Sequence, residues 1–167
     1  GQGAAAMSVA QAARLIAVVG AGGLHRRCPP SLEADAACQE TAVVQDDLAI
    51  EVILSGLLRV VDSGTARRLP KVDGVRVYAK TGTADDPGRT DESPWGIEPA
   101  AYATPHSWFI ALAESEAHPA SQAHTPGRLA IAVVVPRGGS GAGAAGHAAV
   151  DIIGAARDLG YLAEEGS

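Results

Sequence analysis

The sequence predicts a mixed α/β (α+β) fold in which helices pack on a sheet. Two segments in the first half of the 167-residue chain carry apolar residues at helical spacing. Three apolar, β-branched runs follow at about 75–83, 107–113 and 129–135, and another helical pattern lies close to the C-terminus. The expected order is therefore helix, helix, three strands, helix, which suits about one domain.

The first predicted helix runs from Ser8 to Val19, where alanine, leucine and isoleucine recur at helical spacing. Ser8 is a candidate N-cap, and the glycine-rich residues 20–23 are expected to end the helix. Residues 24–45 show no comparable pattern and are predicted to form a loop.

The second predicted helix begins at Asp46 or Asp47, continues through Val61 and ends near Gly64. Its apolar residues recur at intervals of three and four: Leu48, Val52, Ile53, Leu57, Leu58 and Val61. An amphipathic helix of this kind is expected to pack on the sheet.

The strand predicted at 129–135 is an unbroken apolar run, which is typical of a central strand buried on both faces. The last predicted helix covers about 146–159. Residues 114–128 and the glycine-rich residues 138–146 are expected to be flexible turns.

The sharpest chemical signal is Lys80-Thr81-Gly82-Thr83-Ala84, at the end of the first predicted strand. A cation, two hydroxyls and a glycine on consecutive strand positions offer donors and backbone N–H groups along one wall of a cleft. Such a wall suits an anionic, amide-bearing substrate. The alternative is an edge strand capped by a lysine, with a turn glycine and no site.

Taken with its neighbours, this motif resembles the C-terminal half of the transpeptidase domain of penicillin-binding proteins. That family shows a GQG turn, a helix opening near T-P-x-Q-x-A, a helix ending in V-x-x-G-T-A, a KTGTA strand, a W-F strand and an apolar strand. All six occur here in that order, at 1–3, 7–13, 54–66, 80–84, 107–112 and 129–135. The chain departs from the pattern at Ser8-Val9, where Thr-Pro is usual, and by a long insertion at 85–105.

The resemblance implies a β-lactamase/transpeptidase-like fold, with antiparallel strands and packing helices, for residues 1–167. Serine acyl-transferring enzymes of this kind carry S-x-x-K, S-x-N and K-T-G motifs. Only K-T-G is present, and no serine of the chain is followed three residues later by a lysine. We therefore expect that the chain alone is inactive and that it is a fragment, a truncated gene product or a decayed relative.

The absent N-terminal half would carry an all-helical lobe and would leave one face of the sheet bare. We accordingly expect the chain to expose an apolar surface.

The resemblance also assigns roles to the KTGT residues of a peptidoglycan D,D-transpeptidase. Lys80 would raise the positive potential that attracts the terminal carboxylate of a D-Ala-D-Ala stem peptide, and Thr81 and Thr83 would offer hydroxyls to it. Gly82 would let the substrate backbone approach the strand edge, and the N–H of Thr83 would be an oxyanion-hole donor. A serine from the absent half would form the acyl-enzyme, which β-lactams would trap.

Two other functions remain open. The chain is either a non-catalytic binding or regulatory remnant of the same fold, or part of a β-lactamase or D,D-carboxypeptidase-type hydrolase that shares the KTG strand. The GQG turn and the V-x-x-G-T-A helix favour the transpeptidase over the hydrolase. An in-frame S-x-x-K upstream would restore the enzyme and separate these cases.

Composition and charge exclude some classes of binding partner. The net charge of −6 and the lack of a long basic run argue against nucleic acid as a partner. No segment has 18 uninterrupted apolar residues, so no membrane span is expected in this chain. The family acts at the extracytoplasmic face of the membrane, where an N-terminal helix in the absent part would anchor it. No cofactor is expected.

Cys28 and Cys38 bracket a loop containing two prolines. In an exported protein they would either form a disulfide or remain free thiols. Together with His25 they are also conceivable metal ligands, but a fourth ligand is unassigned, so no metal site is predicted.

Overall fold

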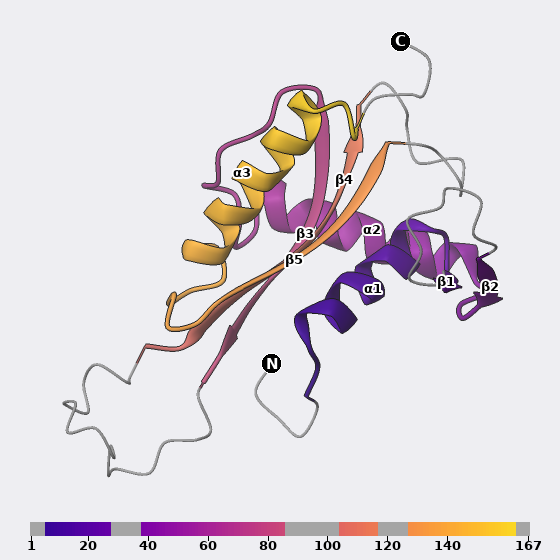
Figure 1. Ribbon diagram of the computed structural model, residues 1–167, viewed down its shortest axis with the longest axis horizontal. Coiled ribbons are helices and arrows are strands. Elements are labelled where there is room, and N and C mark those ends of the chain that lie inside the picture. Colours follow the sequence, from indigo (N-terminus) through magenta and orange to yellow (C-terminus); the bar gives the residue numbers. More distant parts are fainter. Residues whose placement is uncertain (1–5, 28–37, 86–103, 117–126, 163–167) are drawn as a thin grey trace.

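The computed structural model describes residues 6–27, 38–85, 104–116 and 127–162. A three-stranded antiparallel sheet of order β3-β4-β5 forms its centre. Helices α1 and α2 lie on one side of this sheet and α3 lies on the other (Figure 1). The element bounds are α1 Val9–Gly20, β1 Leu24–Arg27, β2 Gln39–Ala42, α2 Asp47–Asp62, β3 Val75–Ala84, β4 His106–Ser115, β5 Arg128–Val135 and α3 Ala144–Asp158.

The two predicted N-terminal helices are confirmed, and their caps explain where they begin. The backbone N–H of Gln11 donates to the Ser8 hydroxyl at 3.2 Å, and the N–H of Ser8 donates to the Gln11 side chain at 2.7 Å. This reciprocal pair satisfies two of the donors that a helix start leaves open. At α2 the carboxylate of Asp46 accepts from the N–H of Ala49 at 3.1 Å, so Asp46 is the cap and the helix begins at Asp47.

The loop predicted for residues 24–45 is wrong in part, because β1 and β2 pair there as an antiparallel ribbon. The ribbon lacks an alternating apolar pattern, and most of its residues are exposed. Arg26 pairs with Glu40 at 2.6 Å across the two strands. Pairing between distant segments made these strands, which local periodicity does not reveal. Cys38 is disulfide-bonded, and Cys28 lies outside the described residues.

The three predicted strands of the main sheet are confirmed, but their arrangement corrects one expectation. Among the described residues β4, not β5, is the middle strand. The apolar run of β5 is explained by the helices instead, because α1 packs on one face of that strand and α3 on the other. Burial on both faces therefore does not require two strand neighbours.

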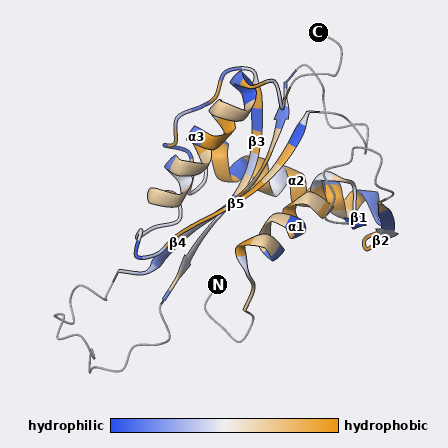
Figure 2. Ribbon diagram, in the orientation of Figure 1, coloured by the Kyte–Doolittle hydropathy of each residue, from blue (hydrophilic) through white to orange (hydrophobic). Residues whose placement is uncertain are grey.

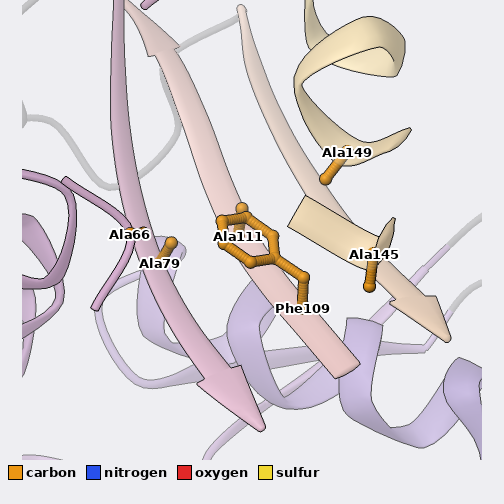
Figure 3. Packing of buried hydrophobic residues seen from close by; sticks show 6 residues of the cluster. All are labelled: Ala66, Ala79, Phe109, Ala111, Ala145 and Ala149. Carbon is orange, nitrogen blue, oxygen red and sulfur yellow. The ribbon is translucent and has the colours of Figure 1, made fainter. Parts of the chain in front are cut away.

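The core between the sheet and α3 is built largely from alanine. Figure 3 shows Phe109 among small side chains of β3, β4, α3 and the turn after α2: Ala66, Ala79, Ala111, Ala145 and Ala149. Phe109 is 1% exposed, and the five alanines are fully buried. With so few large side chains, the elements approach closely to exclude water.

The sheet face expected to be bare is covered, and the exposed apolar surface lies elsewhere. Leu48 and Val52 of α2 are 68% and 64% exposed, and Leu15 of α1 is 52% exposed. Figure 2 shows hydrophobic colours along both helices. The helices thus shield the sheet but present their own outer apolar residues to solvent. We call the exposed side chains of Leu15, Leu48, Val52 and Ile53 the helical apolar patch.

This patch predicts dye binding. The purified chain is expected to enhance the fluorescence of a hydrophobic dye, because dye molecules bind to exposed apolar side chains. Replacing Leu48 and Val52, one turn apart on α2, with glutamine should lower the signal without lowering the unfolding temperature. Dye fluorescence equal for the two proteins would contradict the assignment of the patch.

A buried polar network joins the three strands of the sheet to the end of α1. The Tyr78 hydroxyl donates to Glu114 Oε1 at 2.8 Å, and Arg128 Nε donates to Glu114 Oε2 at 3.0 Å. Arg128 also donates through Nη1 to the carbonyl of Gly20, the last residue of α1, at 2.5 Å. Glu114 is only 2% exposed, so these partners offset the cost of burying its charge.

The network predicts a loss of stability in alkali. Burial, and then the hydrogen bond to Glu114, raise the pKa of Tyr78 above its ordinary value of 10.0. The folded chain thus holds this proton more tightly than the unfolded chain does. The resulting stability is fully present below pH 10 and is lost as pH rises through the folded pKa. Tyr78→Phe should flatten the fall in unfolding free energy above pH 10 and cost about 1 kcal/mol at neutral pH. Tyr161→Phe, at an exposed position, is the control, and equal alkaline profiles for all three proteins would contradict this role.

Candidate functional site

The four residues of the KTGT motif form the second half of β3, an outer strand of the described sheet. Lys80, Thr81, Gly82 and Thr83 lie opposite Ile110, Phe109, Trp108 and Ser107 of β4. Among the described residues β3 has one strand neighbour, so its other edge is unpaired. An unpaired edge offers N–H and C=O groups that an extended peptide can pair with.

The pleat of β3 separates the motif's side chains more than the sequence analysis expected. Tyr78 packs with α1 and α2, whereas Ala79 packs in the α3 core. By alternation, Lys80 belongs to the α1/α2 face, and Thr81 and Thr83 belong to the α3 face. The cation and the two hydroxyls therefore do not share one face and can meet only around the outer edge of the strand.

The side chain of Lys80 lies along the strand itself. It is exposed, and its Nζ donates to the carbonyl oxygen of Thr81 at 2.6 Å. This contact keeps the ammonium beside the motif backbone. Because the group remains exposed, it is accessible to an anionic group of a ligand placed along the edge.

Thr81 is paired with a residue that the sequence analysis did not assign to the site. The hydroxyls of Thr65 and Thr81 lie 2.7 Å apart. Thr65 belongs to the turn that follows α2, and the sequence marked it only as part of the V-x-x-G-T-A landmark. The strand pattern of the sequence cannot predict this pair, because the two threonines belong to different segments that come together only when the chain folds.

Gly82 lies close to atoms of two neighbouring segments. A Cβ placed on Gly82 would lie 3.1 Å from Cβ of Trp108. A Cβ placed on Gly141 would lie 2.6 Å from both the N and the O of Gly82 and 2.7 Å from the O of Trp108. The backbone of Gly141 therefore packs directly against the motif strand. Glycine is required at this position because a side chain would collide with that strand, not because the backbone adopts an unusual conformation.

Residues 138–143 form the predicted turn, but this contact packs the turn against the sheet, and residues 144–146 belong to α3. Gly141 is buried, and Ser107 Oγ donates to the carbonyl of Ser140 at 2.7 Å. The same hydroxyl accepts from the N–H of Ala145 at 3.1 Å, at the start of α3. Ser107 is fully buried opposite Thr83. One serine thus ties the glycine-rich segment to the strand beside the motif, a role its position in an apolar run did not reveal.

A cavity of about 360 Å³ in the described part of the chain lies beside the first half of β3, before the motif. It is lined by the end of α2, by residues 69–77 and by Phe109 and Val150, and no KTGT residue contributes to it. The candidate site is therefore a strand edge and not this partly open pocket.

The metal candidate set from the sequence is not supported. Cys38 is disulfide-bonded, which removes it as a thiolate ligand. Within the described parts of the chain, no three His, Cys, Asp or Glu side chains gather as a metal site.

A comparison with protein-family models matches residues 1–153 to the penicillin-binding protein transpeptidase domain. The chain belongs to this family. Its strand order and helices carry the fold of that domain, as the resemblance implied. No curated protein matches the sequence.

Two solved structures share the fold of this transpeptidase-family chain. PBPA from Mycobacterium tuberculosis is 23% identical, with a TM-score of 0.57; the match covers 95% of this chain and 33% of that one. A chain of a peptidoglycan synthase complex is 19% identical, with a TM-score of 0.52; the match covers 90% of this chain and 22% of that one. The chain thus spans about a third or less of either. In the described residues of this family member, no helix has the length and apolar character to span a membrane.

Proposed function

We propose that residues 1–167 are the C-terminal portion of a transpeptidase domain and supply the substrate-binding strand of a peptidoglycan D,D-transpeptidase. The observation that carries the proposal is the unpaired edge of β3, which bears Lys80, Thr81 and Thr83 in a chain of this family. The stem peptide adds to that edge as an extended strand. Its terminal carboxylate lies near Lys80 and the hydroxyl of Thr81.

The proposed reaction divides between this chain and the rest of the gene product. A serine outside this chain attacks the D-Ala-D-Ala carbonyl, forms an ester to the stem peptide and releases D-alanine. The N–H of Thr83 donates to the oxygen that becomes negative during attack. The amine of a neighbouring stem then attacks the ester, which forms the cross-link and frees the serine. Lys80 contributes electrostatic attraction and the threonines contribute orientation.

The partners and location follow from the same proposal. The ligands are the D-Ala-D-Ala end of peptidoglycan stems and β-lactams, which react with the same serine. The chain would act on the extracytoplasmic side of the membrane, and the disulfide at Cys38 supports an oxidising compartment. The N-terminal portion of the domain would be its immediate structural partner.

A non-catalytic role is the second candidate, and one observation favours it. The sequence holds no S-x-x-K, so this chain alone offers no activated serine. The edge of β3 would then bind peptidoglycan peptides without cleaving them.

The test is incubation with a fluorescent penicillin, followed by a denaturing gel and intact mass, on both the purified chain and the full product of its gene. We expect no adduct on the chain and one adduct per molecule on the full product. Absence of an adduct on both would favour the binding role. An adduct on the isolated chain would overturn our assignment of the nucleophile to another segment.

A further inference from the structure

We propose that Thr65 is a positioning residue for the substrate carboxylate, acting through the hydroxyl of Thr81. This inference rests on the proposed function and adds a residue and a specificity role to it. The contact that carries it is the 2.7 Å separation of the two hydroxyl oxygens. Among the described residues, no other hydrogen bond reaches the Thr81 hydroxyl.

The turn that carries Thr65 is fixed on both sides of that residue. The N–H of Gly64 donates to the carbonyl of Arg59 at 2.8 Å, and the N–H of Ala66 donates to the carbonyl of Val60 at 2.9 Å. A Cβ on Gly64 would lie 2.8 Å from Cα of Val60, so the turn closes directly on the end of α2. Thr65 therefore has little freedom to move its backbone.

The neighbouring alanine fixes the turn against the motif strand. Ala66 is fully buried and packs in the same cluster as Ala79, two residues before Thr81 on β3 (Figure 3). Residues two apart on a strand share a face. Docking Ala66 beside Ala79 thus places Thr65 beside Thr81, and the hydroxyl pair is a consequence of core packing.

Either threonine can donate the shared hydrogen bond, and a bound anion selects one direction. A threonine hydroxyl has one hydrogen and two lone pairs. If Thr65 donates to Thr81, the hydrogen of Thr81 remains available to an anion at the strand edge, and the two bonds reinforce each other. A carboxylate accepts but cannot donate, so it selects this arrangement. Arg67 and Arg68, on the same turn and exposed, add positive charge nearby.

The experiment compares acylation of the full gene product by a penicillin and by its methyl ester, which lacks the carboxylate charge. Thr65→Val and Thr65→Ala remove the hydroxyl, and Thr65→Ser retains it. We expect the two variants without the hydroxyl to acylate about tenfold more slowly with the penicillin. Their rates with the ester should match the parent's rate with the ester. Thr65→Ser should behave as the parent does with both, and unfolding temperatures measured alongside establish that each variant is folded.

Each outcome is decisive. Equal slowing with penicillin and ester would mean that Thr65 only maintains the fold, and unchanged rates with both would mean that it has no role; either result overturns the inference. If the parent reacts with penicillin but the Thr65 variants do not show the expected difference between penicillin and ester, the transpeptidase proposal still stands. A parent that does not react with penicillin refutes the transpeptidase proposal and the Thr65 role together.

Discussion

Replacing Lys80 with alanine is expected to slow acylation of the full gene product by a labelled penicillin by about 10²-fold or more. The ammonium lies beside the motif backbone through its contact with the Thr81 carbonyl, and it is exposed at the edge where the ligand's carboxylate would lie. Its removal takes away a preorganised charge and leaves no other lysine in the motif. The rate of adduct formation, followed by gel fluorescence over time, measures the effect.

The chain offers a matched control in Lys71, its only other lysine. Lys71 precedes β3 and makes a long, exposed ion pair of 4.0 Å with Asp62. Exposed pairs of this kind contribute little. Lys71→Ala should therefore leave acylation unchanged, although it alters the net charge by the same amount. If Lys80→Ala acylates as fast as Lys71→Ala does, Lys80 has no part in the site.

Replacing Gly141 with alanine is expected to lower the free energy of unfolding by about 3 kcal/mol, the upper end of the usual cost of overpacking. The added methyl group would meet the N and O of Gly82 at 2.6 Å. Those atoms belong to strand backbone, which cannot rotate away as a side chain does. The melting temperature should fall by about 6 to 12 °C for a chain of this length. Calorimetry or thermal circular dichroism measures the change.

Gly154 provides the opposite case on the neighbouring helix. A Cβ there meets nothing within 4 Å, and the residue lies inside α3. Gly154→Ala should raise stability by about 0.5 to 1 kcal/mol, since alanine favours helix more than glycine does. If Gly141→Ala and Gly154→Ala change stability alike, the contact between Gly141 and the motif strand is not tight. A folded Gly141→Ala variant should also acylate more slowly, because Gly82 moves.

Several elements were predictable because short stretches of sequence determine them. Ser8 and Asp46 cap the two N-terminal helices within one turn. The apolar runs of β4 and β5 are continuous, and the run that opens β3 is interrupted only by Arg76. The ribbon of β1 and β2 was missed because its strands are exposed and lack alternation. The apolar run of β5 wrongly indicated a central strand, because helices on both faces can bury an outer strand as completely as neighbouring strands do.

The sequence alone determined the three helices and the three strands of the main sheet, the position of Lys80 to Thr83 at the end of a strand, and the family of the domain. Only the tertiary structure decided that Thr65 meets Thr81, that Gly141 presses on Gly82, and that Ser107 joins the glycine-rich segment to α3. Periodicity, caps and motifs act within a few residues of the chain. Contacts between distant segments depend on how closely packed alanines and glycines let the sheet, α3 and the turn after α2 approach one another.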